Sequence, residues 1–94
     1  MVSVAIGRNV KAIGDFSFVW GNYCQTTGTY SFAGGYQSIA YGHYSIALGD
    51  SSTTNADYAV GIGYQTEANG LYSTAIGYLA KASGTSSMAL GGYA

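Results

Sequence analysis

The sequence is poor in charge and has no proline, one cysteine and one histidine. Charged side chains make up 7% of its 94 residues, against about a quarter of a typical globular chain. Because the net charge is −1 and basic residues are few, no basic patch is available for phosphate, and we expect no nucleic-acid partner. No apolar run approaches the roughly 18 residues that a membrane-spanning helix needs. We therefore expect no direct membrane insertion.

Residues that could carry catalytic or metal chemistry are scattered. Cys24 is the single cysteine, so the chain can form neither an internal disulfide nor a thiolate metal cage, and its role is left open. His43 lies beside a predicted turn, where we expect a solvent-facing side chain. Asp residues are sporadic, whereas calcium-binding solenoids repeat them in every unit. A Gly-x-Gly at residues 61–63 lies inside a repeat and is not a nucleotide loop. We predict no enzyme activity, no cofactor and no metal.

The most informative feature of the sequence is a repeat of 14 residues. With Ser3 as position 1, six full units and most of a seventh follow without insertion or deletion, so residues 1–94 are interpreted as one repeat domain of about seven coils. Position 5 is always glycine, and position 12 is glycine except at Ala56. The predicted turn glycines are Gly7, Gly14, Gly21, Gly28, Gly35, Gly42, Gly49, Gly63, Gly70, Gly77, Gly84 and Gly91.

Each half-unit of seven residues suits a strand of four or five residues followed by a tight turn at a glycine with positive φ. Two halves then close one coil of an all-β parallel β-roll, or β-solenoid. A helix is a poor alternative, because a glycine every seven residues would cost about 1 kcal/mol each relative to alanine. At Ala56 we expect the turn to shift by one residue, since the preceding Asn55 tolerates the left-handed conformation.

The outward-facing positions of the two halves differ in polarity. Positions 9 and 11 are apolar at three of 12 places, whereas positions 2 and 4 are apolar at 12 of 14. With small residues inside the coil, positions 2 and 4 would form an apolar stripe too large for a soluble monomer, which favours association with closed cyclic symmetry. The alternative is a monomeric solenoid that turns this large row inward. We expect Trp20 to lean into the space left by Gly34. The predicted oligomer interface comprises Val4, Ile6, Phe18, Trp20, Phe32, Ile46, Leu48, Val60, Ile62, Ile76, Met88 and Leu90.

Position 14 carries a column of aromatic residues that would stack at the strand spacing of about 4.8 Å. One interpretation is that the stack holds the register of the coils, at about 0.5–1.5 kcal/mol per pair. The other is a ligand-binding rail for sugars or for apolar groups of another chain. Tyrosines at positions 6 and 7 would add a recognition surface at a corner; they are Tyr36, Tyr64, Tyr78, Tyr23 and Tyr93. The candidate ligand or stacking ladder comprises Phe16, Tyr30, Tyr44, Tyr58 and Tyr72.

The half-units SVAIG (3–7), SIALG (45–49), STAIG (73–77) and SMALG (87–91) resemble the head repeats of trimeric autotransporter adhesins of the YadA type. SVAIG and STAIG are each followed by a second half with a further small-x-Gly corner. The resemblance implies a left-handed β-roll and a side-by-side homotrimer on the bacterial cell surface that binds matrix proteins or host cells. The collagen-associated version of the motif has Asn at position 14. No unit of this chain does, so collagen binding is not carried over.

The sequence is therefore compatible with two functions. The first is a non-enzymatic, extracellular adhesin head segment that attaches to a host surface, a matrix protein or a glycan. The alternative is a structural segment of a fibre, such as a phage tail fibre, which assembles into a filament by end-to-end stacking of uncapped coils. In the second case the segment would lie on a virion or fibre surface.

Overall fold

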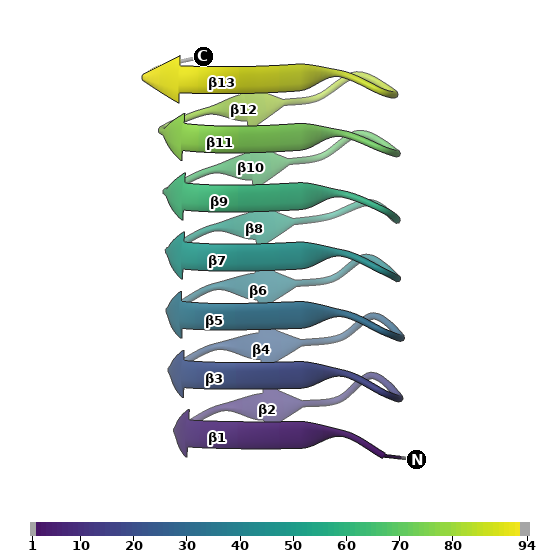
Figure 1. The fold of residues 1–94 in the computed structure, drawn as a ribbon, viewed down its shortest axis with the longest axis vertical. Coiled ribbons are helices and arrows are strands. Elements are labelled where there is room, and N and C mark those ends of the chain that lie inside the picture. Colours follow the sequence, from purple (N-terminus) through teal and green to yellow (C-terminus); the bar gives the residue numbers. More distant parts are fainter. Residues whose placement is uncertain (1, 93–94) are drawn as a thin grey trace.

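The computed structural model describes residues 2–92 as a stack of β-coils (Figure 1). Each complete coil has a long strand of five residues, a corner, a short strand of two residues and a second corner. In Figure 1 the long strands run from right to left in front, and the chain returns behind them through the short strands while rising from the N-terminus. The coil is therefore left-handed. Its Cα atoms span 34 × 21 × 11 Å. The predicted all-β parallel solenoid with 14-residue coils is confirmed.

The strands form two parallel sheets in which each residue pairs with the residue 14 positions further on, such as Val4 with Phe18. Sheet A has the seven long strands: β1 (Val4–Arg8), β3 (Phe18–Asn22), β5 (Phe32–Tyr36), β7 (Ile46–Asp50), β9 (Val60–Tyr64), β11 (Thr74–Tyr78) and β13 (Met88–Gly92). Sheet B has the six short ones: β2 (Lys11–Ala12), β4 (Gln25–Thr26), β6 (Ile39–Ala40), β8 (Thr53–Thr54), β10 (Glu67–Ala68) and β12 (Lys81–Ala82).

Small side chains fill the interior of the coil. Ala33, Ala47 and Ala75 are fully buried, and Val19 is the largest side chain that is completely enclosed. Hydroxyls take part as well: Thr26 Oγ1 donates to Ser17 Oγ at 2.9 Å. The alternative in which the large apolar row points inward is wrong for this chain. An interior of alanine, serine and threonine gains little from burial, because the hydrophobic contribution scales with the apolar area removed from water.

The two series of glycines have different roles. At position 5 all seven have positive φ, between 103° and 136°, as expected for turn glycines. Those at position 12 do not have positive φ, which corrects the expectation for the second series. Both series are needed for close approach of the coils: a Cβ on Gly49 would overlap the carbonyl oxygen of Gly63, and one on Gly70 would overlap that of Gly84.

The left-handed corner residues are instead the non-glycine residues at positions 7 and 14. Their φ values lie between 52° and 61°, a conformation that costs about 1–2 kcal/mol for a residue with a side chain. Hydrogen bonds between coils offset this cost: Tyr44 N–H donates to Thr29 O and Gln37 N–H to Asn22 O, both at 2.9 Å. The residues are Asn9, Tyr23, Gln37, Ser51, Gln65, Leu79, Phe16, Tyr30, Tyr44, Tyr58, Tyr72 and Ser86.

The predicted shift of the turn at Ala56 is wrong. The register of β7 with β9 is the same as elsewhere, and Tyr58 has a φ of 61°, like its equivalents. In-register strands hold both sides of this corner and leave no free residue for a shift. The nearby hydrogen bond from Tyr72 N–H to Asp57 O is 3.2 Å long, against 2.9 Å for that from Tyr58 N–H to His43 O.

Candidate functional site: the outer faces of the coil

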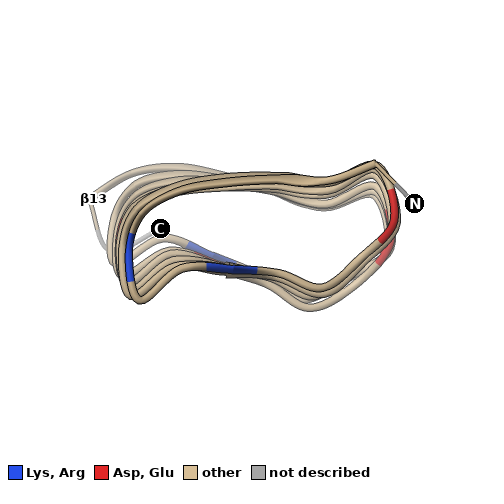
Figure 2. Cartoon of the chain, turned by 90° about the horizontal axis from the view of Figure 1, so that it is seen from below, with Lys and Arg blue, Asp and Glu red and all other residues tan. Residues whose placement is uncertain are grey.

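An apolar stripe runs along the outer face of sheet A. In the single chain Ile6 is 57% exposed, Trp20 is 42% exposed and Leu90 is 56% exposed. Charged residues lie at the two corners and along the short strands, so most of the long-strand side is uncharged (Figure 2). We define the apolar stripe as the twelve residues predicted above, all of which lie in strands of sheet A: Val4, Ile6, Phe18, Trp20, Phe32, Ile46, Leu48, Val60, Ile62, Ile76, Met88 and Leu90.

The row that carries the stripe is interrupted at Gly34 and at Thr74, and the gap at Gly34 is filled within the chain. A Cβ built on Gly34 would overlap the indole ring of Trp20, which lies against the glycine, as expected from the sequence. On the same face of the same two strands, β3 and β5, the rings of Phe18 and Phe32 stack with their centroids 5.2 Å apart. The chain therefore fills its own gap, and the stripe is continuous across the second and third coils.

The aromatic ladder at position 14 is a continuous stack. Neighbouring ring centroids are 5.0 to 5.1 Å apart, and the planes differ by no more than 14°. Each ring is about half exposed. Because each inner ring has a neighbour on both faces, the ladder presents ring edges and hydroxyls to its surroundings. A sugar, which would lie on a ring face, finds such a face only at the two ends of the ladder.

Sequence reasoning missed the left-handed backbone of the ladder. The signal was in the resemblance, since the related motif has Asn at position 14, and Asn is among the few residues that adopt this conformation readily. Tyrosine and phenylalanine occupy the same strained position here. Stacking within the ladder, at about 0.5–1.5 kcal/mol per pair, adds to the hydrogen bonds between coils that offset the strain.

The last residues of the first six long strands, at position 6, form a second column that we call the strand-end column; β13 ends at Gly92, which has no side chain to extend it. Within it Tyr64 and Tyr78 stack at 5.2 Å. Tyr36 contacts Tyr23 at the next position edge to face, at 6.3 Å. Tyr93, predicted to extend this corner, lies outside the described residues. The strand-end column comprises Arg8, Asn22, Tyr36, Asp50, Tyr64 and Tyr78.

At the opposite corner, His43 is exposed but has a defined hydrogen-bond partner. Its Nδ1 accepts a hydrogen bond from the Thr29 backbone N–H at 2.9 Å, and the backbone N–H of His43 donates to Asp57 Oδ1 at 2.9 Å. The side chain of one coil thus caps the backbone of the coil before it. This role explains His43 without catalysis.

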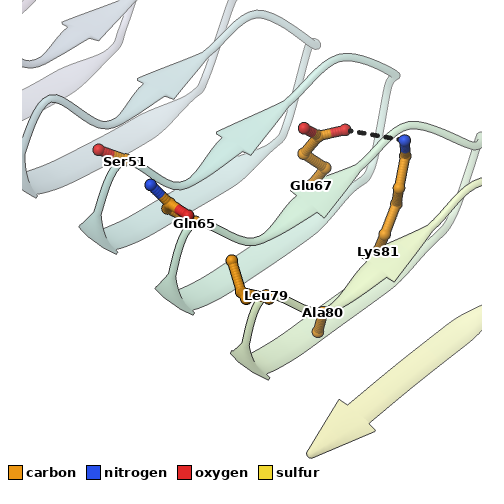
Figure 3. Close-up of a pocket in the computed structure, with 6 residues that line it drawn as sticks. All are labelled: Ser51, Gln65, Glu67, Leu79, Ala80 and Lys81. Carbon is orange, nitrogen blue, oxygen red and sulfur yellow. Dashed lines mark ion pairs between the residues drawn. The ribbon is translucent and has the colours of Figure 1, made fainter. Parts of the chain in front are cut away.

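The outer face of sheet B is polar. Asn55 Nδ2 donates to Asn69 Oδ1, and Lys81 Nζ lies 3.6 Å from Glu67 Oε1 in an exposed ion pair. A shallow hollow of about 360 Å³ lies beside this pair (Figure 3), lined by Ser51, Gln65, Glu67, Leu79, Ala80 and Lys81. A similar hollow of about 350 Å³ lies near the N-terminal end. Its lining includes Cys24, which is buried and whose Sγ lies 3.6 Å from Asn22 O.

Among residues 2–92, no three side chains of His, Cys, Asp or Glu gather in a way that could hold a metal ion. Over the same range no helix is long and apolar enough to cross a membrane.

The repeat pattern also matches a known family model. The model of the YadA head domain repeat (2 copies) matches residues 40–66, 55–80 and 68–94, which together cover more than half of the chain. No curated protein and no solved structure matches the sequence.

Proposed function

Because the chain belongs to the family of YadA head domain repeats, we propose that it is a segment of the head of a trimeric surface adhesin, in which three copies pack through their apolar stripes and the outer faces attach to a ligand. Repeats of this family build extracellular, adhesin-type heads. The architecture needed for such a head, a left-handed parallel coil with a small-residue interior, is present here.

The observation that carries the proposal is the exposed apolar stripe. Soluble monomers rarely show contiguous apolar patches larger than a few hundred Å². The stripe holds twelve large apolar side chains over the length of the coil, and burying each is worth about 1.5–3 kcal/mol. The interior of the single chain supplies little of this stabilisation, because its buried side chains are small. Three stripes packed around one axis supply the missing hydrophobic core.

With sheet A directed toward the axis, sheet B remains on the outside of the trimer. Its amide and hydroxyl side chains, together with the two hollows, then form the surface available to a host, matrix or glycan ligand. This arrangement supports attachment rather than chemistry, since the exposed groups are hydrogen-bonding side chains without a paired nucleophile and base.

The first test is the mass of the folded protein by light scattering after size exclusion, over a tenfold dilution. We expect a constant mass equal to three 9.7-kDa chains. A constant monomer would overturn the trimer. A broad distribution of growing sizes would instead favour the structural-fibre function, in which coils stack end to end.

Attachment needs a separate test. The folded trimer is passed over immobilised matrix proteins, glycans and whole cells, and its retention is compared with that of a scrambled 94-residue control. Retention of the trimer alone supports the adhesin function, and equal retention of both proteins contradicts it.

A further inference from the structure

Two columns of residues border the apolar stripe at opposite ends of the long strands. The aromatic ladder lies two residues before each long strand, and the strand-end column closes each one. Both are partly accessible in the single chain: Tyr58 is 47% exposed and Tyr64 is 40% exposed. The ladder is entirely uncharged, and the strand-end column holds three tyrosines together with Arg8, Asn22 and Asp50.

Cyclic symmetry determines what lies beside each column. A trimer whose threefold axis runs along the direction in which the coils stack keeps every residue at the same height in all three copies. Its contacts are heterologous, which means that each contact joins two different sides of sheet A, the side where the strands begin and the side where they end, in two neighbouring copies. The start of a long strand in one copy is therefore next to the end of the same strand in its neighbour.

We infer that, in the trimer proposed above and resting on that proposal, the aromatic ladder of each copy packs against the strand-end column of the next copy, forming three identical seams. The two residues that meet at a seam come from neighbouring copies and stand at opposite ends of the same long strand in the sequence. At the level of β5, Tyr30 of one copy faces Tyr36 of the next. At the levels of β9 and β11 the pairs are Tyr58 with Tyr64 and Tyr72 with Tyr78. At β7 the partners are Tyr44 and Asp50.

The chemistry of the two columns is complementary at these heights. Three of the levels bring tyrosine to tyrosine, and at the fourth a phenol hydroxyl can donate to a carboxylate. No level brings like charges together. The ring faces of the ladder are occupied by its own stack, so its free edges and hydroxyls suit a neighbouring protein surface better than a flat-lying sugar. The ladder thus extends the apolar stripe instead of forming a separate ligand rail.

The test is crosslinking between two introduced cysteines. Tyr58→Cys and Tyr64→Cys are combined in a Cys24→Ser background, since serine occupies the equivalent position at Ser38 and Ser52. Within one chain these sites lie at opposite ends of β9, roughly 20 Å apart for six steps along a strand. A bis-maleimide with a two-carbon spacer is too short to join them within one chain, but it can join them across a seam.

We expect conversion of most of the protein to a covalent trimer on a denaturing gel. There are three control variants. Two carry only one of the cysteines, and the third combines Tyr72→Cys with Tyr36→Cys, whose positions differ in height by about 14 Å along the stack. All three should remain uncrosslinked. A second pair, Tyr72→Cys with Tyr78→Cys, repeats the test at another level if the first variant does not fold.

Light scattering on the same samples before crosslinking separates the two failures. A trimeric mass without crosslinking at either matched level would overturn the seam and leave the trimer standing. A monomeric or dimeric mass would overturn the trimer together with the seam. Equal crosslinking of the matched and out-of-level pairs would also overturn the seam, because the contact would then lack the predicted register.

Discussion

The indole ring of Trp20 lies against the backbone of Gly34, in the space that a side chain at residue 34 would occupy. The two residues are paired neighbours in β3 and β5. The bulkiest residue of the stripe and the glycine that interrupts its row thus complement each other within one chain. Because Trp20 is the single tryptophan, its fluorescence reports this contact directly.

Gly34→Ala should displace the indole and cost about 1–3 kcal/mol in the free energy of unfolding, because the new methyl group overlaps the ring. Denaturant unfolding measures the loss, and the emission spectrum of Trp20 should change as the ring leaves the backbone of Gly34. Gly92→Ala is the matched control, since a Cβ there meets nothing within 4 Å. An unchanged emission spectrum in Gly34→Ala would contradict the contact.

Position 12 allows a test of the close approach between coils. Gly70→Ala should cost about 1–3 kcal/mol, because its methyl group would overlap the carbonyl oxygen of Gly84. Gly84→Ala, in the same column, should change stability by no more than about 0.5 kcal/mol, because its nearest contact is Ser87 Cβ at 3.7 Å. Thermal unfolding of the two variants side by side provides the comparison. Equal losses would show that the glycines serve a purpose other than spacing.

Ile62→Asp should abolish association, since a charge buried without a partner at the centre of the apolar stripe is strongly unfavourable. The mass by light scattering should fall to that of one 9.7-kDa chain. The control is Thr53→Asp, on the outer face of sheet B, which should leave the mass unchanged. A trimer that survives Ile62→Asp but not Thr53→Asp would mean that the sheets are oriented the other way round.

The hydrogen bond from Thr29 N–H to His43 Nδ1 predicts that neutral His43 carries its proton on Nε2. Nitrogen-15 NMR of the imidazole distinguishes the two tautomers. His43→Ala removes the acceptor, so the Thr29 amide resonance should move in this variant. The Thr27 amide, bonded to Ala40 O, is the internal reference and should stay in place. A Thr29 amide resonance that is unchanged in His43→Ala would argue against the bond.

Much of the fold could be predicted because each residue has its own equivalents, 14 positions away, as neighbours. Small residues at Ala33 and Ala47 can only line a thin interior, and the row containing Phe18 and Ile62 must then point outward. The same argument predicted that Tyr44 stacks on Tyr58 and that the ring of Trp20 lies over Gly34. None of these inferences needed more than the repeat length and the size of the side chains.

The backbone at the corners followed a different rule. Sequence reasoning expected positive φ at both glycine series, which is correct at position 5 and wrong at position 12. The chain uses Gly70 only for space and places the further left-handed residues at positions such as Gln37 and Tyr44. At Ala56 a shifted turn was expected, yet the register is kept. The hydrogen bond between His43 and Thr29 left no pattern in the sequence, because it depends on where the coil brings a single side chain.

The sequence by itself therefore determined the period, the handedness implied by its resemblance, the small interior and the apolar stripe, because these depend on side-chain size repeated at a constant interval. Only the tertiary structure decided which corner residues have positive φ, how Ala56 is accommodated and which backbone group His43 caps. Closing a coil so that every strand lies in register on the next is a constraint on all 14 residues together, and corner angles are the variables that adjust to meet it.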